Sequence, residues 1–273
     1  MRKVTVAVLL VLAMVFSTVS LAAAVTDGEL DLDGHPHVVL LLMEVGGVPK
    51  YRCSGTLLSS TVLLTAGHCT NNYPGEPYSG MRVFTESDVE GGIGTTNNYP
   101  YGRGKYVVEA ESWAAHPLYE TAPFYYHDVG VVVLKKAIKL DTYGVLPTVN
   151  QFDALKDKDG NNTLFTAVGY GAQESFPDAA AWKENNTRTR YVAYPWLLQI
   201  NTGFTGDFSM LLSNNANSGG TCFGDSGGPN FLGDTNIVAG ITSFGMNSTC
   251  GGTGGVFRTD RQDVLDFVTP YLQ

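Results

Sequence analysis

Near its C-terminal end the chain contains the stretch Cys222-Phe223-Gly224-Asp225-Ser226-Gly227-Gly228-Pro229. Glycines stand on both sides of a single serine, and glycine lets the backbone turn tightly enough to direct several N–H groups at one point. A serine hydroxyl is a weak nucleophile unless a neighbouring base takes its proton as it attacks. The stretch therefore predicts a nucleophilic Ser226 that needs a histidine and a carboxylate from elsewhere in the chain.

Two other segments supply these partners. They are Thr65-Ala66-Gly67-His68-Cys69 and Tyr126-His127-Asp128-Val129. Imidazole suits the role of base because its unperturbed pKa lies near neutrality. A buried carboxylate can hold the imidazole in the required tautomer and stabilise its charged form. We therefore expect His68 and Asp128 to lie beside Ser226 in the folded protein.

The three segments closely resemble motifs of the trypsin/chymotrypsin family of serine proteases. Gly-Asp-Ser-Gly-Gly-Pro is the nucleophile motif of that family, Thr-Ala-Gly-His-Cys is its histidine motif, and the order His, Asp, Ser is also shared. The resemblance implies a serine endopeptidase with the triad His68, Asp128 and Ser226, an acyl-enzyme and no cofactor. It also implies an oxyanion hole formed by the N–H groups of Gly224 and Ser226. Its partners would be protein or peptide substrates and protein protease inhibitors.

The resemblance covers the chain from about Val25 to Gln273. Cys53 stands sixteen positions before Cys69, like the disulfide that the family carries over its histidine. Three more segments resemble family motifs around the site: Val168-Gly169-Tyr170-Gly171, Thr242-Ser243-Phe244-Gly245 and Gly255-Val256-Phe257. The implied fold is all-β, with two six-stranded antiparallel β-barrels, the active site between them and a C-terminal helix.

Short apolar runs separated by Gly, Pro and Asn agree with an all-β fold. We expect the N-terminal barrel over about residues 25–145, the C-terminal barrel over about 146–258 and the helix over about 260–270. The apolar residues of the last segment recur at helical spacing, and Pro270 should end or kink that helix.

The substrate pocket follows from the same resemblance. In the family its floor lies six residues before the nucleophile, which is Gly220 here, and a floor aspartate would demand Arg or Lys. Thr221 adds only a hydroxyl, and the wall positions Gly245 and Gly255 carry no side chain to block a large ring. With Ser243 also assigned to the pocket, we expect cleavage after uncharged, large apolar or aromatic residues.

The activation motif of the family, Ile-Val-Gly-Gly after a basic residue, is missing here. However, Val25-Thr26-Asp27-Gly28 begins with valine and has glycine at its fourth place. Cleavage after Ala24 would expose an ammonium on Val25, and in the family such a group pairs with the aspartate before the nucleophile, here Asp225. We hypothesise that export creates this pair; a longer propeptide, or Arg52 as the cation, is the alternative.

The first 24 residues have the pattern of a signal peptide. Arg2 and Lys3 precede an apolar run from Val4 to Val19, and Ala22-Ala23-Ala24 offers small residues to a signal peptidase. A retained membrane anchor is the alternative, although the run is short for a membrane span. We therefore expect a secreted, extracellular protein.

The four cysteines all lie in the exported part of the chain, where an even number favours two disulfides. Three pairings are possible. In the local pairing, Cys53–Cys69 and Cys222–Cys250, each closed loop would contribute about 3–4 kcal/mol in the chain-entropy model. The chain has no C-x-x-C, which disfavours a zinc site built from these cysteines.

The formal net charge of -9 disfavours nucleic acid and acidic membranes as partners. Independently of the charge, we expect a monomer.

We also expect no metal site. His127 has no second ligand four residues further on, and His116 is expected in a surface loop. Asp153, Asp157 and Asp159 lack the spaced glycine and the closing glutamate of a calcium loop.

Two other functions use the same pattern. One is a catalytically inactive relative that only binds a partner, which the loss of a triad residue would favour. The other is an esterase that applies the triad to small esters. All three residue types of the triad are present, which favours an active peptidase.

Overall fold

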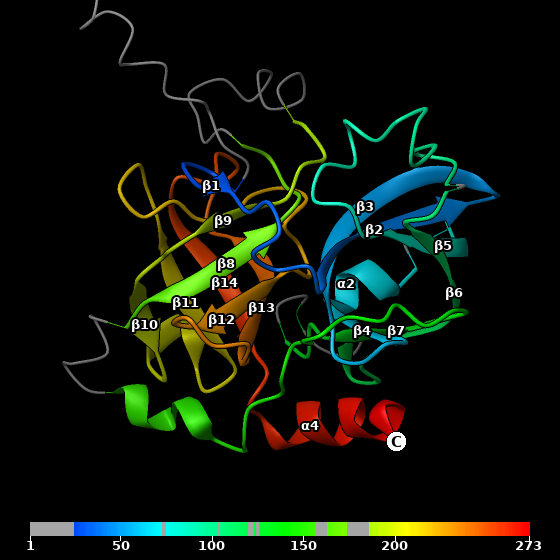
Figure 1. Cartoon of the computed structure of the whole chain (residues 1–273). Coiled ribbons are helices and arrows are strands. Elements are labelled where there is room, and N and C mark those ends of the chain that lie inside the picture. The colour runs from blue at the N-terminus through cyan, green and yellow to red at the C-terminus, as the bar shows by residue number, and fades with distance from the viewer. Residues whose placement is uncertain are drawn as a thin grey trace, which may run out of the picture.

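The computed structural model describes residues 25–72, 75–102, 104–119, 123, 126–156, 163–173 and 186–273. The described chain consists mainly of β-strands in two sheets that lie side by side (Figure 1). The signal peptide expected over residues 1–24 lies outside the described residues. Among the helices that the structure describes, none is both long enough and apolar enough to cross a membrane.

The first sheet is a closed barrel formed by the N-terminal half. Its strands follow the order β2 (Val38–Val45), β3 (Val48–Leu57), β4 (Val62–Thr65), β7 (Gly130–Leu134), β6 (Val107–Ala115) and β5 (Tyr78–Phe84). Branched apolar side chains fill β2, β4 and β7 and suit a pleated, buried surface. The β2–β3 hairpin turns at Gly46 and Gly47, whose φ angles of 59° and 78° are typical of a two-residue type I′ turn.

The second sheet is an open half-barrel. Its order is β1 (Glu29–Leu30), β9 (Tyr191–Ala193), β8 (Phe165–Gly169), β12 (Pro229–Leu232), β13 (Val238–Gly245), β14 (Gly252–Arg258), β11 (Ser209–Asn214) and β10 (Leu197–Ile200). It has eight strands rather than six because β1 pairs with β9 at one edge and β10 pairs with β11 at the other. The all-β fold implied by the resemblance is confirmed, with the second sheet open rather than closed.

The two ends of the described chain cross between the halves. The segment before β2 contributes β1 to the second sheet. Conversely, α4 (Gln262–Val268) follows β14 but lies beneath the first barrel (Figure 1). Its buried Val264 and Val268 belong to the apolar cluster that contains the core of this barrel. A 3-10 turn (Thr269–Leu272) ends the chain where Pro270 cannot continue the α-helix. Both ends therefore hold the two sheets together.

Candidate active site

His68 and Asp128 come from the first barrel. His68 lies in α2 (Gly67–Thr70), a single turn after β4, and Asp128 lies just before β7. Nδ1 of His68 lies 2.9 Å from Oδ2 of Asp128, and the backbone N–H of His68 donates to Oδ1 at 2.8 Å. Because an ionised carboxylate only accepts hydrogen bonds, Nδ1 carries the imidazole proton. The other nitrogen, Nε2, is therefore the basic one.

The surroundings of this pair stabilise a charged imidazole. Asp128 is fully buried, whereas the side chain of His68 is 28 % exposed. Ser243 Oγ donates a short hydrogen bond to Oδ2 of Asp128. Burial opposes protonation of His68, but the Asp128 carboxylate outweighs it and raises the pKa of His68 above its ordinary value.

Ser226 comes from the second half, in the turn between β11 and β12. Gly224 and Gly227 have φ angles of 101° and 79°, which favour glycine. A Cβ on Gly227 would lie only 2.0 Å from Oγ1 of Thr65, at the end of β4. The N–H of Ser54 donates to the Ser226 carbonyl at 2.8 Å. The glycines thus let the serine turn pack directly against the barrel that carries the histidine.

The peptide between Phe223 and Gly224 has a fixed orientation. Its carbonyl accepts a hydrogen bond from the N–H of Ala172 at 2.9 Å. Because C=O and N–H point in opposite directions across a trans peptide, the Gly224 N–H points away from Ala172. Within the described part of the chain, neither this N–H nor that of Ser226 donates to a protein group. Both remain available to an external acceptor, as an oxyanion hole requires.

Ser54 is a supporting residue that the sequence analysis missed. Its Oγ donates to the Gly224 carbonyl at 3.0 Å and accepts from the N–H of Tyr170 at 3.0 Å. One hydroxyl thus connects the serine turn to the Val168–Gly171 segment. Its only sequence signal was its place directly after Cys53.

Asp225 is fully buried behind the serine turn. Its Oδ1 accepts from the N–H of Gly171 at 2.8 Å, and its Oδ2 accepts from the N–H of Cys222 at 2.9 Å. Burial raises the pKa of Asp225 to about 7, although these two N–H groups and Arg52 oppose the rise. A Cβ on Gly169 or Gly171 would lie 2.1 or 2.4 Å from this carboxylate, which explains the paired glycines of that motif.

The segment at Val25 is inserted beside the second sheet. Val25 is fully buried, and Thr26 forms an antiparallel bridge with Gly220, whose N–H donates to the Thr26 carbonyl at 3.0 Å. Oγ1 of Thr26 also lies 3.1 Å from the Gly220 carbonyl oxygen and donates to Oδ1 of Asn214. The segment that begins at Val25 therefore contacts Gly220, which stands two residues before Cys222 in the serine segment.

A cavity of about 310 Å³ opens beside the nucleophile. It is lined by Thr221, Cys222, Phe223, Ser226, Thr242, Ser243, Phe244, Gly245, Asn247, Ser248 and Cys250. These residues include no acidic or basic side chain. Three residues assigned to the pocket from the sequence, Thr221, Ser243 and Gly245, are among them.

The other two assigned pocket residues, Gly220 and Gly255, do not line this cavity. The backbone of Gly220 pairs with Thr26, and an added Cβ there would lie 2.3 Å from the side chain of Asn214. At Gly255, an added Cβ would lie 2.2 Å from the ring of Phe244, so that ring takes the space that the missing side chain leaves. Phe244 in β13 therefore reduces the space that the sequence predicted beside Gly255 in the substrate pocket.

Both disulfides follow the local pairing, Cys53–Cys69 and Cys222–Cys250. The first joins β3 to the helical turn of His68. The second joins the serine segment to the loop between β13 and β14. Each disulfide thus fixes a segment that carries or borders a site residue.

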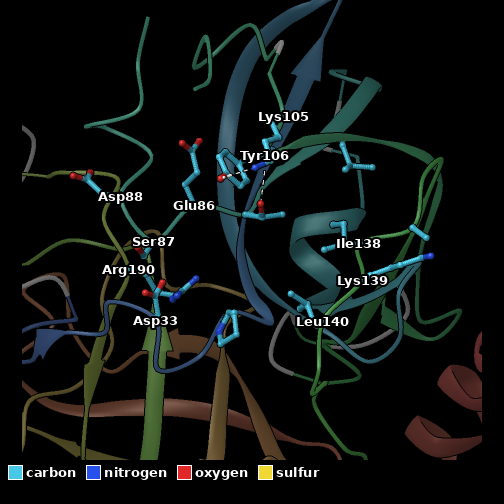
Figure 2. Close-up of a pocket in the computed structure, with 14 residues that line it drawn as sticks. Asp33, Glu86, Ser87, Asp88, Lys105, Tyr106, Ile138, Lys139, Leu140 and Arg190 are labelled. Atoms are coloured by element: carbon cyan, nitrogen blue, oxygen red, sulfur yellow. Dashed lines mark hydrogen bonds between the residues drawn. The ribbon is translucent and has the colours of Figure 1, made fainter. Parts of the chain in front are cut away.

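A second cavity, of about 630 Å³, lies beside the segment that precedes β2 and against the first barrel (Figure 2). Its wall carries charges of both signs, among them Asp33, Glu86, Lys105 and Lys139. None of the three triad residues lines it. The contact between His68 and Asp128, together with the serine turn packed on the same barrel, identifies the candidate site rather than cavity size.

Known proteins resemble this chain over most of its length. The family model "Trypsin" matches residues 30–268. CLIP domain-containing serine protease B15 of Anopheles gambiae is 27 % identical over 271 residues, which cover 89 % of this chain and 70 % of that protein. Collagenase of Hypoderma lineatum is 23 % identical over 206 residues, which cover 72 % of this chain and 67 % of that protein.

The fold also matches a solved structure, that of HL collagenase at 1.7 Å resolution. The TM-score is 0.64 at 21 % identity, with 90 % of this chain and 98 % of the other covered. At 21 % identity, the similarity to this structure shows the fold alone. Family membership rests on the family model, which matches residues 30–268. The chain therefore belongs to the trypsin family of serine proteases.

Proposed function

We propose that this chain is an active, secreted serine endopeptidase with the triad His68, Asp128 and Ser226. The main support is the contact between Nδ1 of His68 and the fully buried Asp128, which leaves Nε2 basic. The serine turn packs against the same barrel and borders the uncharged cavity. Membership of the trypsin family adds the reaction class.

In the proposed mechanism, Oγ of Ser226 attacks the scissile carbonyl while Nε2 of His68 takes its proton. The N–H groups of Gly224 and Ser226 stabilise the oxyanion. His68 then donates the proton to the leaving amine, the C–N bond breaks and an acyl-enzyme remains. Water activated by His68 releases the acid and restores the serine. Asp128 stays ionised throughout and stabilises the imidazolium.

We further propose that the substrate residue before the scissile bond is uncharged and large. Support comes from the cavity beside Ser226, which has a volume of about 310 Å³ even though the ring of Phe244 takes the space at Gly255. Its lining has hydroxyls and no ionised group. Burying an unpaired substrate charge there would be unfavourable. Profiling a peptide library tests this proposal, and strong cleavage after Arg or Lys would overturn it.

The activation proposal is that the ammonium of Val25 pairs with Asp225 after signal peptide removal. Val25 is fully buried and its neighbour Thr26 is paired with Gly220. A carboxylate with a pKa raised to about 7 by burial gains from a nearby cation. N-terminal sequencing of the active secreted protein tests it: a first residue other than Val25 rejects this version.

The peptidase itself is tested in two steps. A fluorophosphonate probe should label the parent protein at Ser226 and leave Ser226→Ala unlabelled, and an unlabelled parent would instead indicate an inactive binder. The rate of casein digestion should then fall by about 10⁴–10⁶-fold in Ser226→Ala and in His68→Ala, because triad members act as a unit. A labelled parent that cleaves small esters but never casein or peptides would be an esterase.

A further inference from the structure

The residue before Asp128 has an unusual backbone conformation. His127 has a φ angle of 52°, in the left-handed region where residues other than glycine are strained and depend on their surroundings. The N–H of Val129 donates to the His127 carbonyl at 2.7 Å and closes a tight turn around Asp128. The direction in which Asp128 projects from this turn therefore depends on His127 keeping that conformation.

A residue from the other end of the chain contacts His127. Nδ1 of His127 lies 2.8 Å from Oδ2 of Asp263, in the first turn of α4 and 136 residues further along the chain. This helix buries Val264 and Val268 in the apolar cluster that contains the core of the first barrel. Asp263 is thus a carboxylate on a rigid support that accepts a hydrogen bond from the strained residue.

His116 supports the same contact. Its ring lies parallel to that of His127, with centroids 4.9 Å apart, and Phe267 of α4 packs edge-on against it at 5.2 Å. Its N–H donates to the Val129 carbonyl at 2.9 Å, directly after Asp128. The expectation of a surface-loop position for His116 was wrong, since it is 7 % exposed, because α4 covers it.

The cluster of His116, His127 and Asp263 brings three potential metal-ligand atoms within 4.8 Å of one another. The geometry nevertheless disfavours an ion. A ring nitrogen directs its lone pair in the plane of its ring, and the two stacked rings are only 9° from parallel, so their lone pairs do not converge. Nδ1 of His116 also accepts from the N–H of Leu118, which leaves the proton on Nε2 facing Asp263. The cluster is a hydrogen-bonded support.

We propose that Asp263 is a positioning residue for the catalytic aspartate. It holds His127 in the left-handed conformation and thereby directs the Asp128 carboxylate at Nδ1 of His68. This inference rests on the proposed peptidase function, in which Asp128 orients the imidazole. It gives the C-terminal helix a role in the active site that goes beyond packing.

The first test is kinetic. Asp263→Ala should lower kcat by about 10-fold to 100-fold, the cost of misplacing a catalytic group by a fraction of an ångström to an ångström, while KM changes little. Asp263→Asn still presents an acceptor oxygen to His127 and should retain most of kcat. Asp266→Ala is the matched control, because this exposed residue of the same helix bonds only Gln262 among the described contacts. Full activity in Asp263→Ala would overturn the proposal.

A second experiment, in the His127→Gly protein, distinguishes a positioning role of Asp263 from a general loss of helix stability. Glycine adopts a φ angle of 52° without strain, so His127→Gly removes the need for support. Asp263→Ala should therefore lower kcat in the parent but have no further effect in the His127→Gly protein. An equal loss of kcat in both backgrounds would show that Asp263 acts through stability alone.

A spectroscopic readout does not depend on turnover. The Nδ1 proton of His68, hydrogen-bonded to Asp128, should give a low-field ¹H resonance in the parent and in Asp266→Ala. It should broaden or disappear in Asp263→Ala and persist in Asp263→Asn. An unlabelled, inactive parent would refute the peptidase proposal, whereas an unchanged resonance in Asp263→Ala would refute the positioning role.

Discussion

Asp128 and Asp225 are both fully buried, yet their surroundings differ in kind. Asp128 meets an imidazole and the hydroxyl of Ser243, so its charge is coupled to a group that can take up a proton. Asp225 meets two backbone N–H groups, and burial still raises its pKa to about 7. Burial alone therefore does not assign a function to an aspartate; the partners do.

The comparison is tested most strongly at Asp128. Asp128→Asn should fold normally but lower kcat by about 10⁴-fold, because a neutral amide neither stabilises the imidazolium nor enforces the tautomer of His68. Peptide hydrolysis measures the loss, and thermal unfolding serves as the folding control. A loss below tenfold would show that Asp128 supports structure only.

The second test concerns stability when Asp225 lacks the Val25 ammonium, in Ser226→Ala protein with the Val25 amino group acetylated. The pKa of Asp225 rises on folding from 3.8 to about 7. The free energy of unfolding is therefore highest below pH 4, where Asp225 is neutral in both states, and it falls as the pH rises through 7. The loss should reach about 4 kcal/mol. Urea unfolding between pH 4 and pH 9 measures it.

The control for this second test is Asp225→Asn in the same acetylated background. Its free energy of unfolding should fall less between pH 4 and pH 9 than that of the protein with Asp225. Protein with a free Val25 ammonium should also lose less stability near neutral pH. Identical pH profiles for the free and acetylated forms would contradict the ion pair between Val25 and Asp225.

The third test asks whether Asp225 supports catalysis without touching substrate. In the processed enzyme, Asp225→Asn should lower kcat/KM by about 10²–10³-fold, comparable to the loss of one oxyanion donor, because the Gly224 N–H is no longer held in place. Substrate hydrolysis with and without N-terminal acetylation measures it. If acetylation lowers the activity of Asp225→Asn as much as that of the parent, the two groups do not act together.

The smallest expected effect is at Ser243, which the sequence assigned only to the pocket. Ser243→Ala removes one donor from Oδ2 of Asp128 but leaves the contacts with His68. We expect kcat to fall about tenfold and the free energy of unfolding to fall by about 1–3 kcal/mol. Ser248→Ala, in the same cavity wall, is the control. Equal kinetic effects of the two substitutions would place Ser243 in substrate binding instead.

Local patterns were sufficient for much of this site. The glycines around Ser226 and the paired glycines of Val168–Gly171 reflect close backbone approaches that any larger residue would block. The spacing of Cys53 and Cys69 agreed with a disulfide that the structure contains. Such signals are readable because each constraint acts within a few residues of the motif that reveals it.

Contacts between distant segments were not readable in this way. The sequence suggested no partner for His127, since Asp263 lies 136 residues away and on another secondary-structure element. It placed Gly220 and Gly255 in the pocket, whereas the side chains of Asn214 and Phe244 fill the space beside them. Side-chain packing across strands decided these positions, and short motifs carry no record of it.

By itself, the sequence determined the family-like motifs, the all-β class and the residue types available for nucleophile, base and carboxylate. The tertiary structure alone decided which buried aspartate meets the imidazole, where Val25 is inserted and how α4 returns to the first barrel. The physical reason is range: backbone turns depend on neighbours in the chain, whereas burial and charge pairing depend on neighbours in space.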